Sequence, residues 1–185
     1  MRLHEGWCVW LTGLPGSGKS TAANLLLKKL RAKNIHAQLV SIDVLRHAVT
    51  PKPSYSEKER DMVYAALEFT ARLLTENGIN VIIDATGNRR RYRDQARKQI
   101  PKFVEVYLQC PMDLCIQRET GRKDTHLAPK QIYKKGLAGK SRTVPGVNVP
   151  YEKPIYPELV IDTDKQTPRE NVQKILNVVT KLYEK

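Results

Sequence analysis

The sequence is poor in cysteine, and its cysteines lack the spacing that metal and disulfide sites require. The 185 residues include three, Cys8, Cys110 and Cys115, and no two of them form a C-x-x-C pair. Disulfide frameworks and zinc sites usually show paired cysteines at short intervals. Cys8 and Cys110 fall on predicted strands, so we interpret them as small core residues. We expect neither a disulfide framework nor a zinc site.

Long apolar segments are also missing. The chain contains no run of 18 or more apolar residues, so we predict no membrane span. The first residues show no signal-peptide pattern, because an apolar strand is predicted almost at once, and we therefore expect a cytoplasmic protein. Hydrophobic content of 41% and charged content of 28% are typical of globular chains. The length predicts one domain that spans residues 1–185.

Acidic residues are scarce relative to basic ones. Asp and Glu total 19 against 32 Lys and Arg, so the formal net charge is +13 at pH 7. Such an excess suits polyanionic partners, either nucleotides or a nucleic acid. It also fits a surface of solvated lysines, which is how we interpret the lysines near the C-terminus. Basic clusters stand out at 89–93 and at Lys134-Lys135, and the interpretation of the charge stays open.

What the sequence does contain is a glycine-rich turn between a predicted strand at 7–11 and a predicted helix at 19–32. The turn fits G-x-x-x-x-G-K-[ST]. Its glycines bring backbone N–H groups close to an anion, and the helix N-terminus adds partial positive charge. Lys19 supplies a cation for the outer phosphates and a catalytic group, and the Ser20 hydroxyl can bind Mg²⁺. The predicted ATP-binding residues of this P-loop are Gly13, Leu14, Pro15, Gly16, Ser17, Gly18, Lys19, Ser20 and Thr21.

Strands and helices alternate along the rest of the chain. Further strands are predicted at 37–42, 80–84, 103–108 and 159–162, and further helices at 57–76, 89–99, 111–119 and 168–185. This order predicts a three-layer α/β fold of the P-loop NTPase kind, with a five-stranded parallel sheet covered by helices on both faces. Residues 120–150 are polar and rich in glycine and proline, and we predict a mobile lid there with a short helix near 129–138.

Several charged side chains follow the predicted strand ends, where open parallel sheets bind their ligands. Asp43 can orient an acceptor hydroxyl, accept its proton, or hold Mg²⁺ through water, although an Asp after a strand can also cap a helix. Arg46 and Arg60 can hold an anionic acceptor, with a surface ion pair as the alternative. Asp84 can serve the metal or the acceptor, or cap the next segment.

Three more cations are candidates. Lys134 and Lys135 lie in the predicted lid, where they can close over bound phosphates or simply stay solvated. Arg118 ends the helix before the lid, so it can stack on the base of ATP. The alternative for Arg118 is a cation that the helix C-terminus favours.

Motifs extend well beyond the P-loop. They include Asp43-Val-Leu-Arg46-His47, Tyr55-Ser56 with Glu59-Arg60, Tyr133-Lys-Lys-Gly-Leu-Ala-Gly139, Val144 to Pro154 with Pro-Tyr-Glu-Lys-Pro at its end, and Pro157-Glu-Leu159. Together with the segment from Val9 to Thr21, these stretches resemble the adenylyl-sulfate (APS) kinase family. The resemblance covers most of the chain.

The resemblance implies an activity and its requirements. Members of the family transfer the γ-phosphoryl group of ATP to the 3′-hydroxyl of adenosine 5′-phosphosulfate in sulfate assimilation, with Mg²⁺, and they are often homodimers. Asp43 matches the family's catalytic Asp, Ser20 and Asp43 are the expected metal contacts, and Arg46 and Arg60 match acceptor-binding positions.

The sequence departs from the family pattern around the acceptor. The family's acceptor-binding Asn is Val63, and the two arginines that follow it are Ala65 and Ala66. The stretch that begins with Asp84 and includes Asn88 replaces the family's S-x-I-S-P-Y-R. We assign Asp84 and Asn88 to the acceptor site. About eight extra residues lie near 121–130.

Three other functions stay open. The first is a kinase of the same fold with a different acceptor hydroxyl, on a nucleotide, a sugar or a nucleotide-linked metabolite. The second, less favoured, is a nucleic-acid 5′-kinase, which the net charge and the arginines at 89–93 would support. The third is a nucleotide-binding regulator that has lost catalysis.

Overall fold

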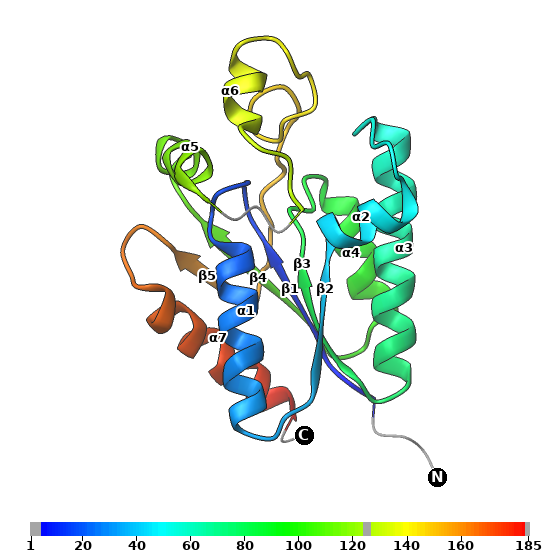
Figure 1. The fold of residues 1–185 in the computed structure, drawn as a ribbon. Helices are drawn as coiled ribbons and strands as arrows, with labels where there is room; N and C mark the ends of the chain where they lie inside the picture. Colours follow the sequence, from blue (N-terminus) through cyan, green and yellow to red (C-terminus); the bar gives the residue numbers. More distant parts are fainter. Residues whose placement is uncertain (1–4, 124–126, 184–185) are drawn as a thin grey trace.

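The computed structural model describes residues 5–123 and 127–183, and a sheet of five parallel strands lies at its centre (Figure 1). Its strands are β1 (Cys8–Thr12), β2 (Ala37–Ser41), β3 (Asn80–Asp84), β4 (Phe103–Gln109) and β5 (Leu159–Asp162). Their spatial order is β2-β3-β1-β4-β5, so the strand that leads into the P-loop is central. The predicted three-layer fold is confirmed.

Helices cover both faces of the sheet (Figure 1). On one face lie α1 (Lys19–Ala32) and α7 (Pro168–Tyr183), and on the other lie α2 (Ile42–Val49), α3 (Glu57–Glu76) and α4 (Arg90–Gln99). Beyond the carboxyl ends of the strands are α5 (Met112–Gly121) and α6 (Ile132–Leu137). Residues 184–185, the end of the last predicted helix, lie outside the described residues.

Two cores result from the alternation of side chains along the strands. On β1, Val9 and Leu11 join the core under α1 and α7, whereas Cys8 and Trp10 join the core under α3 and α4. Because β1 is buried on both faces, its sequence is a continuous apolar run. Cys8, Cys110 and Cys115 are buried free thiols; Cys8 lies on β1 as expected, whereas Cys110 follows the last residue of β4 and does not lie on a strand.

The second strand ends earlier than its sequence suggested. We expected a strand through Ile42 and no helix directly after it, but β2 ends at Ser41 and α2 begins at Ile42. Ile42 is buried at the start of this eight-residue helix, so its apolar side chain resembled one more strand position. The correction matters because it places Asp43 in the first turn of a helix, where the partial positive charge favours a carboxylate.

The segment around α6 packs on the P-loop through a small third core. Buried Cys115, Tyr133 and Val144 belong to this core, and Leu14 of the P-loop packs against it. The Tyr133 hydroxyl donates a hydrogen bond to the Pro15 carbonyl at 2.8 Å. One position of this segment is described, and its motion as a lid stays a prediction; residues 124–126 of the predicted lid lie outside the described part.

Within residues 5–123 and 127–183, none of the helices combines the length and the apolar character needed to cross a bilayer.

Candidate active site

A cavity of about 520 Å³ lies at the carboxyl edge of the sheet, between the P-loop and the elements on either side. The predicted site residues that line it are Pro15, Gly16, Gly18, Lys19, Ser20, Thr21, Asp43, Arg46, Arg60, Asp84, Arg118 and Lys135. A larger cavity of about 810 Å³ includes only Leu14 of the P-loop. We therefore assign the site to the smaller cavity, where the phosphate-binding and carboxylate residues converge.

The P-loop has the backbone that its glycines predict. Gly16 has a φ of +82°, a left-handed value that glycine adopts without strain, and Gly18 at φ +98° precedes the first residue of α1. A Cβ on Gly16 would lie 2.3 Å from the Cys115 carbonyl oxygen, so no larger residue fits. The start of α1 thus faces the cavity with its free N–H groups.

Lys19 is buried and rests on the loop itself. Its Nζ donates to the carbonyl oxygens of Gly13 at 3.0 Å and Leu14 at 2.9 Å. Burial lowers the pKa of Lys19, and the nearby carboxylates of Asp84 and Asp43 oppose this shift. The ammonium group therefore has carbonyl partners that a phosphate oxygen can replace, and Gly13 and Leu14 contribute through their backbone.

Sheet pairing brings two carboxylates together. Asp84 ends β3 opposite Ser41 on one side and Leu11 on the other, so it lies between the P-loop strand and the start of α2. Burial raises the pKa of Asp43, the negative charge of Asp84 raises it further, and Lys19 opposes both. Asp43 and Asp84 therefore act on one another electrostatically inside the same cavity.

These carboxylates and the Ser20 hydroxyl offer only oxygen donors. Among the described residues there is no group of three or more His, Cys, Asp or Glu side chains that could hold a metal by themselves. Mg²⁺ does not require such a cage, because it usually keeps several waters and takes one or two protein oxygens together with phosphate oxygens. The donor set at Ser20, Asp43 and Asp84 fits that requirement.

Both predicted acceptor-binding arginines line the cavity, and both are held by protein partners. Arg46 forms a buried ion pair with Glu59 and lies 4.7 Å above the ring of Tyr55. The Arg60 Nε donates to the Tyr55 carbonyl at 3.0 Å, and its Nη2 donates to the Thr143 carbonyl. A guanidinium has five N–H donors, so both side chains are positioned while keeping donors for a ligand.

We call the side of the cavity lined by Arg46 and Arg60 the acceptor wall, and Asn88 lies behind it. It is 2% exposed and does not line the cavity. Its Oδ1 accepts from Arg60 Nη1 at 3.1 Å, and its Nδ2 donates to the Pro150 carbonyl at 3.2 Å. Its amide therefore links Arg60 to the segment that follows α6, at Pro150. The direct acceptor contact predicted for Asn88 does not match this position.

Four other predicted residues also lie outside the cavity lining, namely Gly13, Leu14, Ser17 and Lys134. Lys134 is exposed and does not line the cavity, whereas Lys135 does. Ser17 is fully buried, and its hydroxyl has no hydrogen-bond partner among the described residues. Val63, which replaces the family's Asn, is fully buried in the core under α3. The neighbouring Tyr64 lines the cavity in its place.

Arg118 is fixed at the other end of the cavity. Its Nη1 donates to the Thr163 hydroxyl at 3.1 Å, and its Nη2 donates to the Thr163 carbonyl at 2.8 Å. These bonds hold the guanidinium plane beside the loop that follows β5. A guanidinium group held by two such hydrogen bonds has a fixed plane, which can stack on a planar base.

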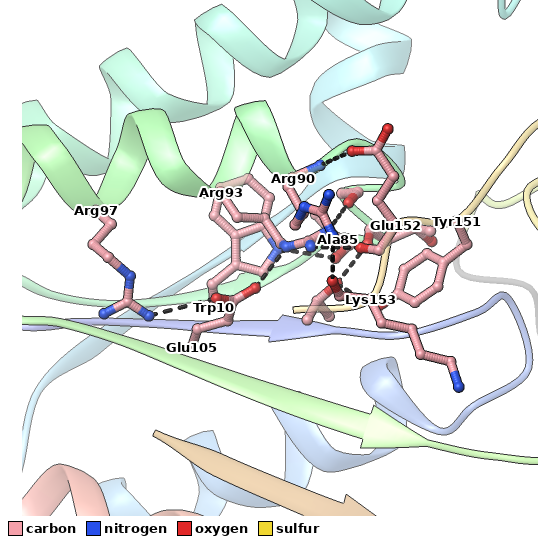
Figure 2. A network of polar contacts seen from close by, with 12 residues as sticks. Trp10, Ala85, Arg90, Arg93, Arg97, Glu105, Tyr151, Glu152 and Lys153 are labelled. Atoms are coloured by element: carbon pink, nitrogen blue, oxygen red, sulfur yellow. Dashed lines mark hydrogen bonds and ion pairs between the residues drawn. The ribbon is translucent and has the colours of Figure 1, made fainter. Parts of the chain in front are cut away.

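The arginine run at 89–93 is used inside the protein. Figure 2 shows buried Arg93 beside Glu105, which it contacts at 2.6 Å, and Arg93 Nη2 donates to the Glu152 carbonyl at 2.7 Å. Arg89 pairs with the Glu152 carboxylate at 3.1 Å, and Arg91 pairs with Asp61. Arg89 and Arg93 are therefore occupied by Glu152 and Glu105, whereas Arg91 is paired with α3 and stays exposed.

Sequence reasoning missed several residues of the cavity wall. They include Tyr64, Thr86, Arg122, Ser141 and Thr143. Arg122 directly follows α5 and has an extended backbone, so helical spacing from Arg118 does not predict its position. Tyr64 lies on α3, and Thr86, Ser141 and Thr143 come from loops; the place of all four in the cavity wall depends on tertiary packing.

Comparison with known proteins places these features in a family. The sequence profile of the adenylylsulphate kinase family matches residues 5–162. A probable adenylyl-sulfate kinase from Archaeoglobus fulgidus is 39% identical over 157 residues, which cover 85% of this chain and 96% of that protein. A probable bifunctional SAT/APS kinase from Sorangium cellulosum is 36% identical over 93% of this chain, which spans only 28% of that longer protein.

A solved structure agrees with the sequence relatives. The APS kinase of Mycobacterium tuberculosis, solved in complex with AMPPNP and APS, superposes with a TM-score of 0.84 at 31% identity. The superposition covers 98% of this chain and 99% of that one. On the family profile and these relatives, the chain belongs to the adenylyl-sulfate kinase family.

Proposed function

We propose that the protein transfers the γ-phosphoryl group of ATP to the 3′-hydroxyl of adenosine 5′-phosphosulfate. The observation that carries the proposal is one cavity in which a P-loop, two carboxylates and two braced arginines converge. Family membership supports it, as does the Mycobacterium tuberculosis relative that was solved with an ATP analogue and APS.

The donor half of the reaction is assigned to the P-loop and α5. The loop amides and Lys19 bind the β- and γ-phosphates, and the Lys19 ammonium exchanges the carbonyls of Gly13 and Leu14 for phosphate oxygens. Arg118 stacks on the adenine. Mg²⁺ held by Ser20 and, through water, by Asp43 would neutralise charge on the phosphates when it is bound.

The acceptor half is assigned to α2, α3 and β3. Asp43 orients the acceptor hydroxyl and takes its proton, and its raised pKa improves it as a base compared with an exposed Asp. Arg46 and Arg60 place the acceptor's anionic group, and Asp84 and Lys135 complete the wall. Catalysis then depends on position and charge stabilisation, as expected for phosphoryl transfer.

One observation favours a second candidate, a kinase of this fold with another acceptor. Val63 is 0% exposed and packs in the core, so it offers no polar group where the family has an acceptor-binding Asn. A site that loses a hydrogen bond to a polar substrate can lose several orders of magnitude in discrimination. The acceptor could then be a nucleotide, a sugar or a nucleotide-linked metabolite.

A panel of acceptors with γ-labelled ATP and Mg²⁺ tests the proposal. APS, other nucleotides, sugars and a 5′-hydroxyl oligonucleotide are offered separately to the purified chain, with Lys19→Ala as the inactive control. We expect label on APS and on no other acceptor. Label on another compound and none on APS would establish the second candidate. If the protein consumes no ATP with any of these acceptors, a regulator that has lost catalysis is favoured.

The assembly and the surroundings belong to the same proposal. We propose a homodimer, as the resemblance implies, and a cytoplasmic location, where ATP is supplied. Light scattering on the purified protein measures the first and cell fractionation the second. We also propose that the segment 129–150 closes as a lid over the bound phosphates, which ligand-dependent protection from proteolysis would report.

A further inference from the structure

One cation of the cavity has no place in the reaction as assigned so far. Arg122 follows the last residue of α5 and lines the cavity together with Lys19, Ser20 and Asp43. It lies at the beginning of the stretch near 121–130 that we expect to be additional to the family pattern.

Two protein groups contact the Arg122 side chain. Its Nη2 donates to the Pro129 carbonyl at 3.3 Å and lies 3.9 Å from the Glu119 carboxylate, whose side chain is fully buried. Within the described part of the chain, the buried Nε has no hydrogen-bond partner. Because a guanidinium has five N–H donors, several of them remain for a ligand in the cavity.

The charge of Arg122 is felt at the catalytic end of the cavity. It opposes the effect of burial on the pKa of Asp43, and it adds to the effect of burial that lowers the pKa of Lys19. Arg118, one turn earlier, is instead held by Thr163 beside the loop after β5. The two arginines therefore lie in different surroundings, Arg118 beside the loop after β5 and Arg122 near Lys19 and Asp43.

We propose that Arg122 is a further catalytic residue that contacts the phosphoryl group during its transfer. In this step the bond from the γ-phosphorus to the β-γ bridging oxygen breaks, and a bond to the acceptor oxygen forms. ADP leaves with the electron pair of the broken bond, and the hydroxyl proton goes to Asp43. Negative charge on the equatorial oxygens of the phosphoryl group is matched by the planar fork of the guanidinium.

The inference rests on the proposed function for the acceptor, but its contact is with the donor. Three variants separate it from other roles: Arg122→Ala, Arg122→Lys, and the control Lys123→Ala, which removes the same charge from the exposed neighbouring residue. For each we measure kcat and KM with APS, and the affinities for ADP and for the non-hydrolysable ATP analogue AMPPNP, each with Mg²⁺. Thermal melting monitored by circular dichroism checks that each variant is folded.

For Arg122→Ala we expect kcat to fall about 10²-fold, with KM for APS nearly unchanged. Its affinity for AMPPNP should fall about tenfold, because a bond to a charged oxygen is lost, while its affinity for ADP stays the same. Arg122→Lys should recover part of kcat, since it keeps the charge without the fork. Lys123→Ala should match the wild type. Equal loss of ADP and AMPPNP affinity, a raised APS KM at normal kcat, or no effect beyond that of Lys123→Ala would each overturn the proposal.

Failure of the proposed function would look different. In that case the wild type would not phosphorylate APS at all, yet it would still bind ADP and AMPPNP. The comparison of these two affinities between wild type, Arg122→Ala and Lys123→Ala then decides the role of Arg122 without any acceptor. A selective loss of AMPPNP affinity supports the proposal, and its absence overturns it.

Discussion

The phosphate end and the acceptor wall of the cavity are built in opposite ways. At the phosphate end, Lys19 rests on carbonyls five and six residues before it, so the geometry is local. At the acceptor wall, Arg60 of α3 is held by Asn88 after β3 and by Thr143 from the segment after α6. The first end is a property of one short stretch, whereas the second exists only when distant segments meet.

This difference bears on the departures from the family pattern that we expect around the acceptor. A local loop that binds phosphates serves any acceptor, so it has little reason to change. The acceptor wall decides which hydroxyl is phosphorylated, and there Val63 has withdrawn into the core while Arg46 is paired with Glu59. Changes at the two ends should therefore have different kinetic effects.

The largest effect is expected at the phosphate end. Lys19→Ala removes the cation for the outer phosphates and should lower kcat about 10³-fold or more. Lys28→Ala, an exposed lysine on the same helix, is the control and should behave like the wild type. Steady-state kinetics with saturating ATP measure both. A kcat for Lys19→Ala close to that of Lys28→Ala would break the assignment of this end.

Asp43 lies between the two ends, and its variant should separate chemistry from binding. Asp43→Asn keeps the shape of the side chain but cannot take the proton, so kcat should fall about 10²-fold. The affinity for ATP, measured by calorimetry, should change little. A loss of ATP affinity with unchanged kcat would instead assign Asp43 a structural role at the start of α2.

A brace behind the acceptor wall should affect the acceptor only. Asn88→Ala removes the partner of Arg60 and should raise KM for the acceptor about fivefold, with KM for ATP unchanged.

Asn80 provides a matched control for this change. It is also a buried amide that bridges two segments, through Trp7 and His36, but it does so at the start of β3, away from the cavity. Asn80→Ala should lower the free energy of unfolding without a selective rise in acceptor KM. If both variants raise KM equally, the acceptor wall has no special brace.

The smallest effect is expected in the pH profile. Burial and the charge of Asp84 raise the pKa of Asp43, so Asp43 keeps its proton to a higher pH than an exposed Asp. Removing that charge in Asp84→Asn lowers the pKa of Asp43, and the acid limb of kcat/KM should move to lower pH. Asp94→Asn, an exposed residue on α4, should leave the limb in place. If the acid limb stays in place or moves to higher pH in Asp84→Asn, the charge of Asp84 does not raise the pKa of Asp43.

The sequence by itself determined the phosphate end. The turn from Gly13 to Thr21 is contiguous, and steric limits on glycine and the free N–H groups at a helix start act within a few residues. The parallel sheet was predictable for a similar reason, because the alternation of strands and helices repeats along the chain. The short α2 was missed, since the buried Ile42 at its start looked like a continuing strand.

Only the tertiary structure decided the rest. Asp43 and Asp84 become neighbours because β2 pairs with β3, with Ser41 opposite Asp84. Asn88 holds Arg60 instead of contacting a ligand, and Arg89 and Arg93 bind Glu152 and Glu105, because partners 12 to 63 residues away in the sequence occupy their donors. Such contacts depend on the path of the whole chain, and no local pattern of residues records which distant carbonyl or carboxylate will be within reach.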